Sequence, residues 1–327
     1  PYELEKCVYE ATHGRKGPVW LDIPLDIQSA EIEPENLKHF VPERQDTETA
    51  YGIEEVIDFL KKSKRPLILA GHGVNASHSQ EELRSLIEIT GIPVLSTWRT
   101  LDLMGADEGY FFGSPGLQAP RYSNIIIQHC DFLLVLGSRL DNMITAFNEE
   151  HFAAMADVVV VDIDENELNK LHITNLIPVL SDVGDFLRKL NTELDGTDLA
   201  DYSGWVSRCQ KIKEKYPLLN EKQSVEEGVD LYRVTSEISR IAKTDDTLVI
   251  SSTSRCNTAG HIAFDRQRGQ KSISSMGFGS MGFALPSAVG TRRAHTRRRC
   301  RSTARCPCSS VSVLCRRSAH CPTRLIP

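Results

Sequence analysis

The sequence predicts an α/β protein with a doubly wound parallel sheet at its centre, and two features of residues 65–164 carry this prediction. Apolar runs at 67–70, 132–136 and 158–161 lack the strict polar–apolar alternation of a half-exposed strand. Strands buried on both faces of a parallel sheet have this composition. Each run passes directly into glycine or acidic residues (GHG, GSRLD and DID), so ligand contacts are expected at the carboxyl ends of the strands.

Helical and strand patterns alternate through residues 51–190, which predicts one Rossmann-like domain with right-handed crossovers. Apolar residues at helical spacing predict helices from Ile53, around 122–129 and from Asp182. Ser79 and Glu82 form a capping-box pattern for another helix, which Gly91 ends. Short apolar runs at 92–96 and 177–180 supply two more strands. The loop that follows residue 96 is long, and loops of this length are usually functional.

The flanking segments are shorter. Residues 1–33 contain a predicted strand at 19–23 and are too few for a domain, so we interpret them as the carboxyl-terminal remnant of one. Polar residues 34–50 form a linker, and residues 191–230 form a second linker with one helix near 205–216. Residues 231–290 begin a third domain. It has a predicted helix from Leu231, strands at 248–251 and 272–275, and a glycine-rich turn that runs into a helix.

Residues 291–327 differ in character from the rest of the chain. They hold ten Arg and no Lys, Asp or Glu, a net charge of +10, so the first 290 residues carry −16 (−6 minus +10). Without periodicity or core-forming residues, this segment is predicted to be an aberrant, disordered tail produced by a shifted reading frame or a misjoined exon. Its CPC pair resembles a metal-binding cysteine cluster, and its Arg run resembles a nucleic-acid-binding segment. We expect neither function.

Composition also bounds the setting of the protein. No apolar run is long enough to span a bilayer and neither end resembles a secretory signal, so a cytoplasmic protein without membrane partners is expected. The histidines at 72, 78, 129 and 261 show no ligand spacing and are expected to be surface or satisfied residues. Four Cys outside the tail are scattered singly and predict buried or free thiols: Cys7, Cys130, Cys209 and Cys256.

Three blocks now stand together: GPVWLDIP (17–24), the sheet with its three turns, and ISSMGFGSMGFALPSAVG (273–290). In this order they resemble the thiamine diphosphate-dependent enzymes of the acetolactate synthase large-subunit type, over most of residues 1–290. The resemblance implies the end of a pyrimidine-binding domain at 1–33, a central FAD- or nucleotide-binding-like domain at 51–190, and the start of a diphosphate-binding domain at 231–290. It also implies a transferase of branched-chain amino acid biosynthesis that decarboxylates pyruvate and joins the two-carbon unit to a second carbonyl compound.

The resemblance further implies cofactor contacts in the third domain. Gly279 and Met281 match positions at the aminopyrimidine, where an apolar and polarisable side chain supports the bent cofactor. Asn257 matches a polar cofactor-site residue, although Arg255 stands just before this group where the family has Gly. A core position is the alternative for Met281. The activating glutamate and the Mg²⁺-binding element of the family are expected to lie outside this chain, which predicts no catalytic residue or metal ligand and a fragment inactive alone.

Eleven residues of the central domain match FAD-contacting positions of the family: Gly71, Gly73, Thr97, Gly113, Gly116, Gly137, Arg139, Asp141, Asp162, Ile163 and Asp182. Gly71 and Gly73 would permit close approach to a diphosphate, Arg139 would pair with phosphate, and an acidic residue after a strand would accept ribose hydroxyls. The alternatives are a plain strand-to-helix turn for the glycines and a local ion pair for Arg139 with Asp141. For Asp164, a helix cap is preferred.

Two rival functions stay open at this point. The central domain alone could be a non-catalytic module that binds FAD or another nucleotide, and the tail could bind nucleic acid. The acceptor substrate and the presence of FAD are not determined by these motifs. Family members build each site between two subunits, so a homo-oligomer that acts on a small 2-oxo acid is implied.

Overall fold

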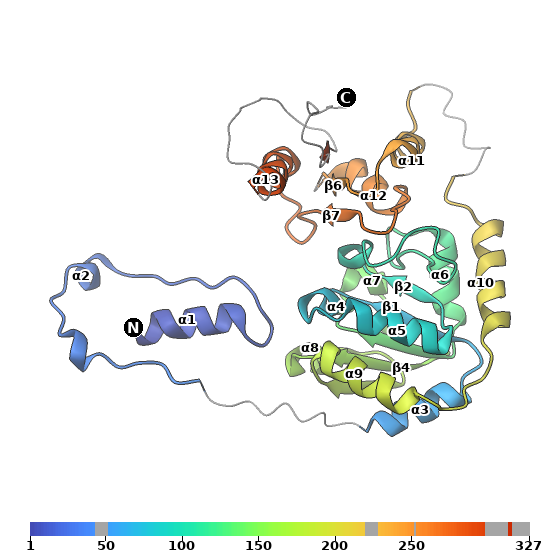
Figure 1. Ribbon diagram of the computed structural model, residues 1–327, viewed down its shortest axis with the longest axis horizontal. Coiled ribbons are helices and arrows are strands. Elements are labelled where there is room, and N and C mark those ends of the chain that lie inside the picture. The colour runs from blue at the N-terminus through green and yellow to red at the C-terminus, as the bar shows by residue number, and fades with distance from the viewer. Residues whose placement is uncertain (43–51, 220–227, 252, 298–312, 316–327) are drawn as a thin grey trace.

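The computed structural model describes residues 1–42, 52–219, 228–251, 253–297 and 313–315 (Figure 1). Five parallel strands form the central sheet in the order β2-β1-β3-β4-β5. They are β1 (Pro66–Ala70), β2 (Val94–Ser96), β3 (Phe132–Leu136), β4 (Asp157–Asp162) and β5 (Leu176–Leu180). The predicted α/β fold with a parallel sheet is confirmed, and register pairs such as Ile68 with Leu134 run along β1 and β3.

Helices cover both faces of this sheet. On one face, α3 (Ile53–Lys62), α5 (Gln80–Thr90) and α9 (Val183–Leu194) share a core with Ile68 and Leu134. The opposite face packs the alternate residues of the same strands, including Leu67 and Leu133. There the cover comes from α6 (Arg121–His129), α8 (Glu165–Asn169) and α10 (Ser203–Lys215). Burial of both strand faces is the physical reason for the continuous apolar runs in the sequence.

Short helical turns lie along the carboxyl edge of the sheet. They are α4 (Gly73–Ala76), η2 (Trp98–Thr100) and α7 (Asn142–Thr145). A further turn, η3 (Glu149–His151), lies instead near the end of α6, where Gln128 donates to the His151 carbonyl. The chain passes from β1 to β2 on one side and returns to β3 on the other, so the strand order reverses between β1 and β3. Open α/β sheets bind ligands at such a switch point.

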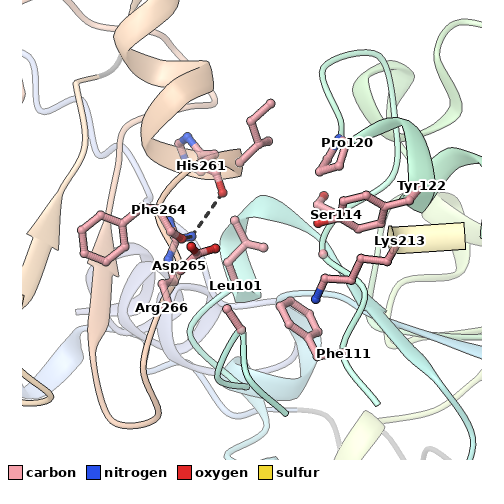
Figure 2. A pocket seen from close by; sticks show the side chains of 13 residues that line it. Leu101, Phe111, Ser114, Pro120, Tyr122, Lys213, His261, Phe264, Asp265 and Arg266 are labelled. Atoms are coloured by element: carbon pink, nitrogen blue, oxygen red, sulfur yellow. Dashed lines mark hydrogen bonds between the residues drawn. The ribbon is translucent and has the colours of Figure 1, made fainter. Parts of the chain in front are cut away.

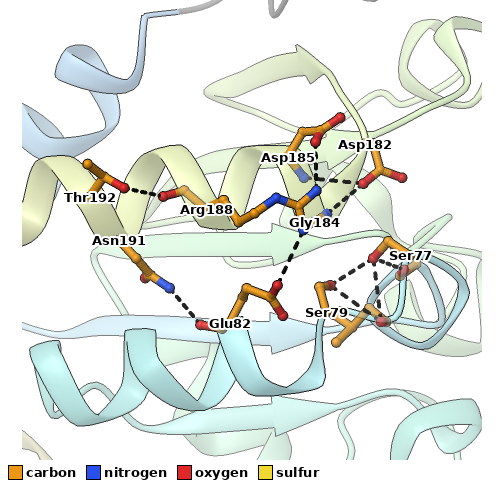
Figure 3. Close-up of polar contacts among 11 residues, drawn as sticks. Ser77, Ser79, Glu82, Asp182, Gly184, Asp185, Arg188, Asn191 and Thr192 are labelled. Carbon is orange, nitrogen blue, oxygen red and sulfur yellow. Dashed lines mark hydrogen bonds and ion pairs between the residues drawn. The ribbon is translucent and has the colours of Figure 1, made fainter.

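The helix ends on the α5–α9 face combine sequence signals with long-range contacts (Figure 3). Asp182 caps α9, with its carboxylate accepting from the backbone N–H groups of residues 184 and 185 at 2.8 and 3.2 Å. Ser79 is the N-cap residue of α5, but its side chain makes no capping bond and donates to the Val74 carbonyl. The predicted capping box is wrong, because Glu82 pairs with Arg188 of α9 at 3.3 Å. Gly91 ends α5 as expected, at φ 65°.

The first 42 residues contain α1 (Tyr2–Thr12), α2 (Leu25–Gln28) and η1 (Pro34–Asn36). The predicted strand at 19–23 is wrong: this segment has no regular structure and Trp20 is 90% exposed. A strand needs a hydrogen-bonding neighbour, and no described strand pairs with these residues. Arg15 and Lys16 contact helices of the central domain, through Asp164 at the start of α8 and the carbonyl of Ala76 in α4.

A smaller sheet follows the second linker, in the order β7-β6-β8. Its elements are α11 (Leu231–Ile241), β6 (Thr247–Val249), α12 (Ser254–Ile262), β7 (Lys271–Ile273), α13 (Ala284–Arg297) and β8 (Val313–Cys315). Both predicted strands are present, one residue earlier and shorter than expected. The expectation of disorder after residue 290 differs from the structure at 291–297, which continue α13, and at 313–315, which pair with β6. The other tail residues lie outside the described residues.

The helices and the cysteines of the described residues bear on two expectations from composition. None of its helices has both the length and the apolar character needed to cross a membrane. The four cysteines before the tail are free, and Cys130 and Cys209 are buried, as predicted. Burial raises the pKa of Cys209 to about 12, so this thiol stays protonated and behaves as a small apolar residue.

Candidate functional site

The glycines at the switch point lie together and hold two loops against each other. Gly71 N donates to the Leu136 carbonyl at 2.8 Å, and Gly73 N donates to the Gly137 carbonyl at 2.9 Å. A Cβ on Gly71 would lie 2.3 Å from the Gly137 oxygen. The alternative reading of these glycines, a turn that needs small residues, therefore accounts for them without a ligand. Since Gly137 N donates to the Val161 carbonyl, the turn after β4 also lies at this edge.

Three further candidates order the long loop after β2. The backbone N–H of Thr97 donates to the Ala70 carbonyl, and its hydroxyl lies 3.1 Å from that of Thr100. Gly113 accepts from Ser96 N at 2.9 Å. Gly116 exchanges two hydrogen bonds with the Asn124 amide, at 2.8 and 2.9 Å. These residues thus fix the path of the loop across the carboxyl ends of β1 and β2.

The carboxylates of the acidic candidates accept hydrogen bonds from backbone N–H groups. Asp141 caps α7, accepting from Met143 N at 3.0 Å, as Asp182 caps α9. Asp162 is buried and accepts from Asp164 N at 3.0 Å, and burial raises the pKa of its carboxyl. Asp164 caps α8, as preferred from the sequence. The half-buried Ile163 follows β4 directly.

Arg139 forms an ion pair, but not with the neighbour that the sequence suggested. Its Nε lies 3.0 Å from Oε1 of Glu167, whereas Asp141 is occupied as a cap. The central-domain candidates therefore share one edge of the sheet, and most of their polar groups bond to the protein itself.

One further candidate, Asn257, lines an open cleft of about 500 Å³ at the start of α12. The cleft is lined by the loop at 117–119, by Tyr232 of α11, and by residues that include Arg255 and Asn257. Within the described residues, Asn257 Oδ1 is buried without a hydrogen-bond partner. Thr258 donates to Gln118 at 2.8 Å and closes one side. The guanidinium of Arg255 and the first turn of a helix suit a ligand with an anionic group. The unpaired Asn257 oxygen can accept a hydrogen bond from a donor on such a ligand.

Gly279 and Met281 lie in the loop between β7 and α13 and do not line this cleft. Gly279 has φ 60° and its N–H donates to the Ser275 carbonyl at 2.9 Å. Met281 is 87% exposed, so the alternative of a core methionine is wrong. The structure thus brings Asn257 to a cleft and leaves Met281 at the surface of the described chain.

The contact between the two sheets contains residues that sequence reasoning missed (Figure 2). A small cavity of about 60 Å³ separates them, and Lys213 and Asp265 point into it from opposite sides. Burial lowers the pKa of the Lys213 ammonium and raises that of the Asp265 carboxyl. Arg266, which is buried, also lines the cavity. No spacing or motif marks these residues, because their proximity depends on how the two sheets pack.

His261 also lies at this contact and is satisfied, as the sequence analysis expected. Its ring stacks on Trp98 with 4.3 Å between centroids and 12° between planes. Nδ1 lies 2.7 Å from the carbonyl of Asn257, and Nε2 lies 3.2 Å from the hydroxyl of Ser274. The first contact requires a proton on Nδ1, so Nε2 accepts from the serine in a neutral ring.

Stability is expected to fall in mild acid because of His261. Burial lowers the pKa of this imidazole to about 3, against 6.5 in an exposed histidine. The unfolded chain therefore takes up the proton first, and the contribution of His261 is complete above about pH 6.5 and lost toward pH 3. At pH 5 the loss is about 2 kcal/mol relative to pH 7, measured by urea unfolding.

The control for this expectation is His261→Phe, which keeps an aromatic ring on Trp98. Buried carboxyls with raised pKa, such as Asp162, act in both proteins and cancel in the comparison. The variant should therefore lose less stability between pH 7 and pH 5 than the wild type. Equal losses in the two proteins would contradict the assignment.

Among the described residues, no group of three or more His, Cys, Asp or Glu side chains could hold a metal ion.

The central domain matches a known protein family. Residues 53–190 match the model of the thiamine pyrophosphate enzyme central domain. This match contains the five-stranded sheet and its covering helices except α10.

Three relatives represent the similar proteins. The acetolactate synthase large subunit of Corynebacterium glutamicum is 28% identical over 305 residues, covering 89% of this chain and 47% of the relative. Acetolactate synthase 1, chloroplastic, of Zea mays is 30% identical over 300 residues, covering 89% and 46%. The acetolactate synthase isozyme 2 large subunit of Escherichia coli is 29% identical over 309 residues, covering 89% and 52%. The chain spans about half the length of the curated relatives it matches.

Proposed function

We propose that this chain, which contains a thiamine pyrophosphate enzyme central domain and is related to acetolactate synthase large subunits, serves thiamine diphosphate-dependent carboligation. The substrate would be a 2-oxo acid such as pyruvate, and the acceptor a second carbonyl compound. When bound, the cofactor supplies the nucleophilic carbon that the protein's own side chains lack. The contribution of this chain is to bind and orient the cofactor.

The observation that carries the proposal is the cleft at α12. Arg255 is exposed at its wall and can pair with a diphosphate, and the cleft lies at the first turn of α12, the end of a helix at which backbone N–H groups bind phosphate. The buried Asn257 Oδ1 awaits a donor from the ligand. Mg²⁺ would accompany the diphosphate, as in the family. We assign no ligand for it in this chain.

A second proposal concerns the assembly of the protein and its setting. The relatives are named large subunits, which supports action in an assembly. We propose that the assembly is a homo-oligomer and that its setting is the cytoplasm. Light scattering on the purified protein tests the first point. A mass equal to one chain at micromolar concentration would contradict it.

The cofactor proposal is tested by titrating the full chain with thiamine diphosphate and Mg²⁺, and separately with thiamine, in a calorimeter. We expect thiamine diphosphate to bind at least 10-fold more tightly, because only it carries the anionic group. Arg255→Met should remove most of that difference. Arg208→Met, an exposed arginine of α10 outside the cleft, should not change it.

Two results would count against the proposal. Equal affinity for thiamine and thiamine diphosphate would remove the diphosphate site at α12. Binding of FAD or ADP to the full chain without binding of thiamine diphosphate would favour the rival, a non-catalytic nucleotide-binding module.

A further inference from the structure

Two opposite charges face the cavity between the two sheets without bonding to each other (Figure 2). Lys213 of α10 and Asp265, which follows α12, point into this space of about 60 Å³ from opposite sides. Among the described residues, neither side chain forms a hydrogen bond or an ion pair. Polar groups in such places are normally satisfied by the protein, a water or a ligand. One donor and one acceptor are therefore available at the same cavity.

Aromatic rings hold the Lys213 ammonium at the wall of the cavity. Its Nζ lies 5.9 Å from the ring centroids of both Phe112 and Tyr122. Burial lowers the pKa of the ammonium, and the charge of Asp265 offsets only part of this effect. A carboxylate in the cavity would give the ammonium a hydrogen-bond acceptor and favour its charged form.

The other cation that lines the cavity has no donor to spare. Arg266 directs its guanidinium to three carbonyls of residues 260–264 and to the hydroxyl of Ser272. Asp265, by contrast, is exposed, so the cavity opens to solvent beside a carboxylate without a bonded partner in the described chain. An ammonium group on a ligand can reach this carboxylate from the open side.

The size and the donors of the cavity limit the ligand. A cavity of about 150 Å³ accommodates benzene, so one of about 60 Å³ admits roughly three non-hydrogen atoms, the size of a carboxylate group. Burial raises the pKa of Tyr122 to about 12, so its hydroxyl stays protonated at neutral pH and can donate to that group. The rest of the ligand would stay at the open side. The site thus suits a small molecule with a carboxylate at one end and an ammonium at the other.

We propose that this cavity binds a small zwitterion, of the class of a free α-amino acid with little or no side chain. Its carboxylate would bind Lys213 and Tyr122, and its ammonium would bind Asp265. Because Lys213 and Tyr122 belong to helices of the central sheet and Asp265 follows α12, the ligand would join the two sheets. The inference does not depend on carboligation at the α12 cleft, and the two can fail separately.

The test is equilibrium dialysis of the full chain with radiolabelled glycine at fixed ionic strength. Acetate and methylammonium serve as the ligands that carry only one of the two charges. Glycine should bind about 10-fold more tightly than either of them, because only glycine satisfies both side chains. Dialysis counts bound ligand directly, so a general stabilising effect of the solute does not enter the result.

Substitutions separate the two ends of the ligand. Lys213→Met keeps the apolar stem against the rings and should weaken glycine binding about 10-fold, to the level of methylammonium. Asp265→Asn keeps the size of the carboxyl group and should bring glycine binding to the level of acetate. Lys211→Met is the matched control, because Lys211 is an exposed lysine of the same helix outside the cavity. It should change glycine affinity less than 2-fold.

Folding is checked by the far-ultraviolet circular dichroism melt of each variant. The comparison of the three ligands on the wild type needs no substitution, so it decides the proposal if a variant does not fold. The proposal is overturned if the wild type binds glycine no more tightly than acetate or methylammonium, which would leave water as the occupant of the cavity. It is equally overturned if Lys211→Met weakens glycine binding as much as Lys213→Met, which would indicate general electrostatics.

Discussion

Gly137→Ala is expected to cost about 4 kcal/mol of stability, because the turn after β3 has room for no side chain. The residue has φ 60°, and a Cβ there would lie 2.4 Å from Gly73 Cα and 2.9 Å from Gly73 N. Both neighbours are backbone atoms, so neither can rotate away. The loops after β1 and β3 would have to separate and lose the bonds that join them. Guanidinium unfolding measures the change.

Gly196→Ala separates the two causes of this loss. Gly196 also has a left-handed backbone, at φ 73°, but a Cβ there would meet no atom within 4 Å. It should cost only the conformational penalty, about 1 kcal/mol. If Gly137→Ala costs no more than Gly196→Ala, then the contact between the loops is not what requires glycine.

Arg266→Met is expected to cost about 3 kcal/mol, because a buried guanidinium organises the end of α12. The side chain is 5% exposed. It donates to the carbonyls of Gly260 (2.9 Å), His261 (3.1 Å) and Phe264 (3.2 Å), and to the hydroxyl of Ser272 of β7 (2.7 Å). Methionine fills similar space but leaves these acceptors buried without a donor.

Arg268→Met supplies the comparison for this substitution. Arg268 lies two residues further along the chain and is exposed, so its loss should change stability by less than about 0.5 kcal/mol. Urea unfolding of both variants gives the difference. Equal stability of Arg266→Met and Arg268→Met would show that the buried hydrogen bonds contribute nothing.

Elements whose signals are local were predictable from the sequence. The apolar runs predicted the buried strands because burial on both faces removes the need for alternation, and Gly91 marked the end of α5. Two local predictions failed where distant partners intervened. Glu82 forms an ion pair with Arg188 of α9 instead of a capping box with Ser79. Residues 19–23 form no strand because no described strand pairs with them.

The sequence predicted where the candidate site residues lie, at one edge of the sheet, but not which residues they contact. Gly71, Gly137 and Asp162 were expected at one edge, and the structure places them there. Their bonding was not predictable. The partner of Arg139 is 28 residues away in sequence, since it is Glu167 on α8 rather than the adjacent Asp141. Arg15 reaches the same carboxylate from outside the sheet.

The sequence by itself determined the class of the fold, the order of its elements and the family that the chain resembles. These follow from hydrophobic pattern and from short motifs, which depend on neighbours along the chain. Only the tertiary structure decided which charges meet, which glycines touch and which amide stays without a partner. Those facts depend on distances between residues remote in sequence, and packing alone sets them.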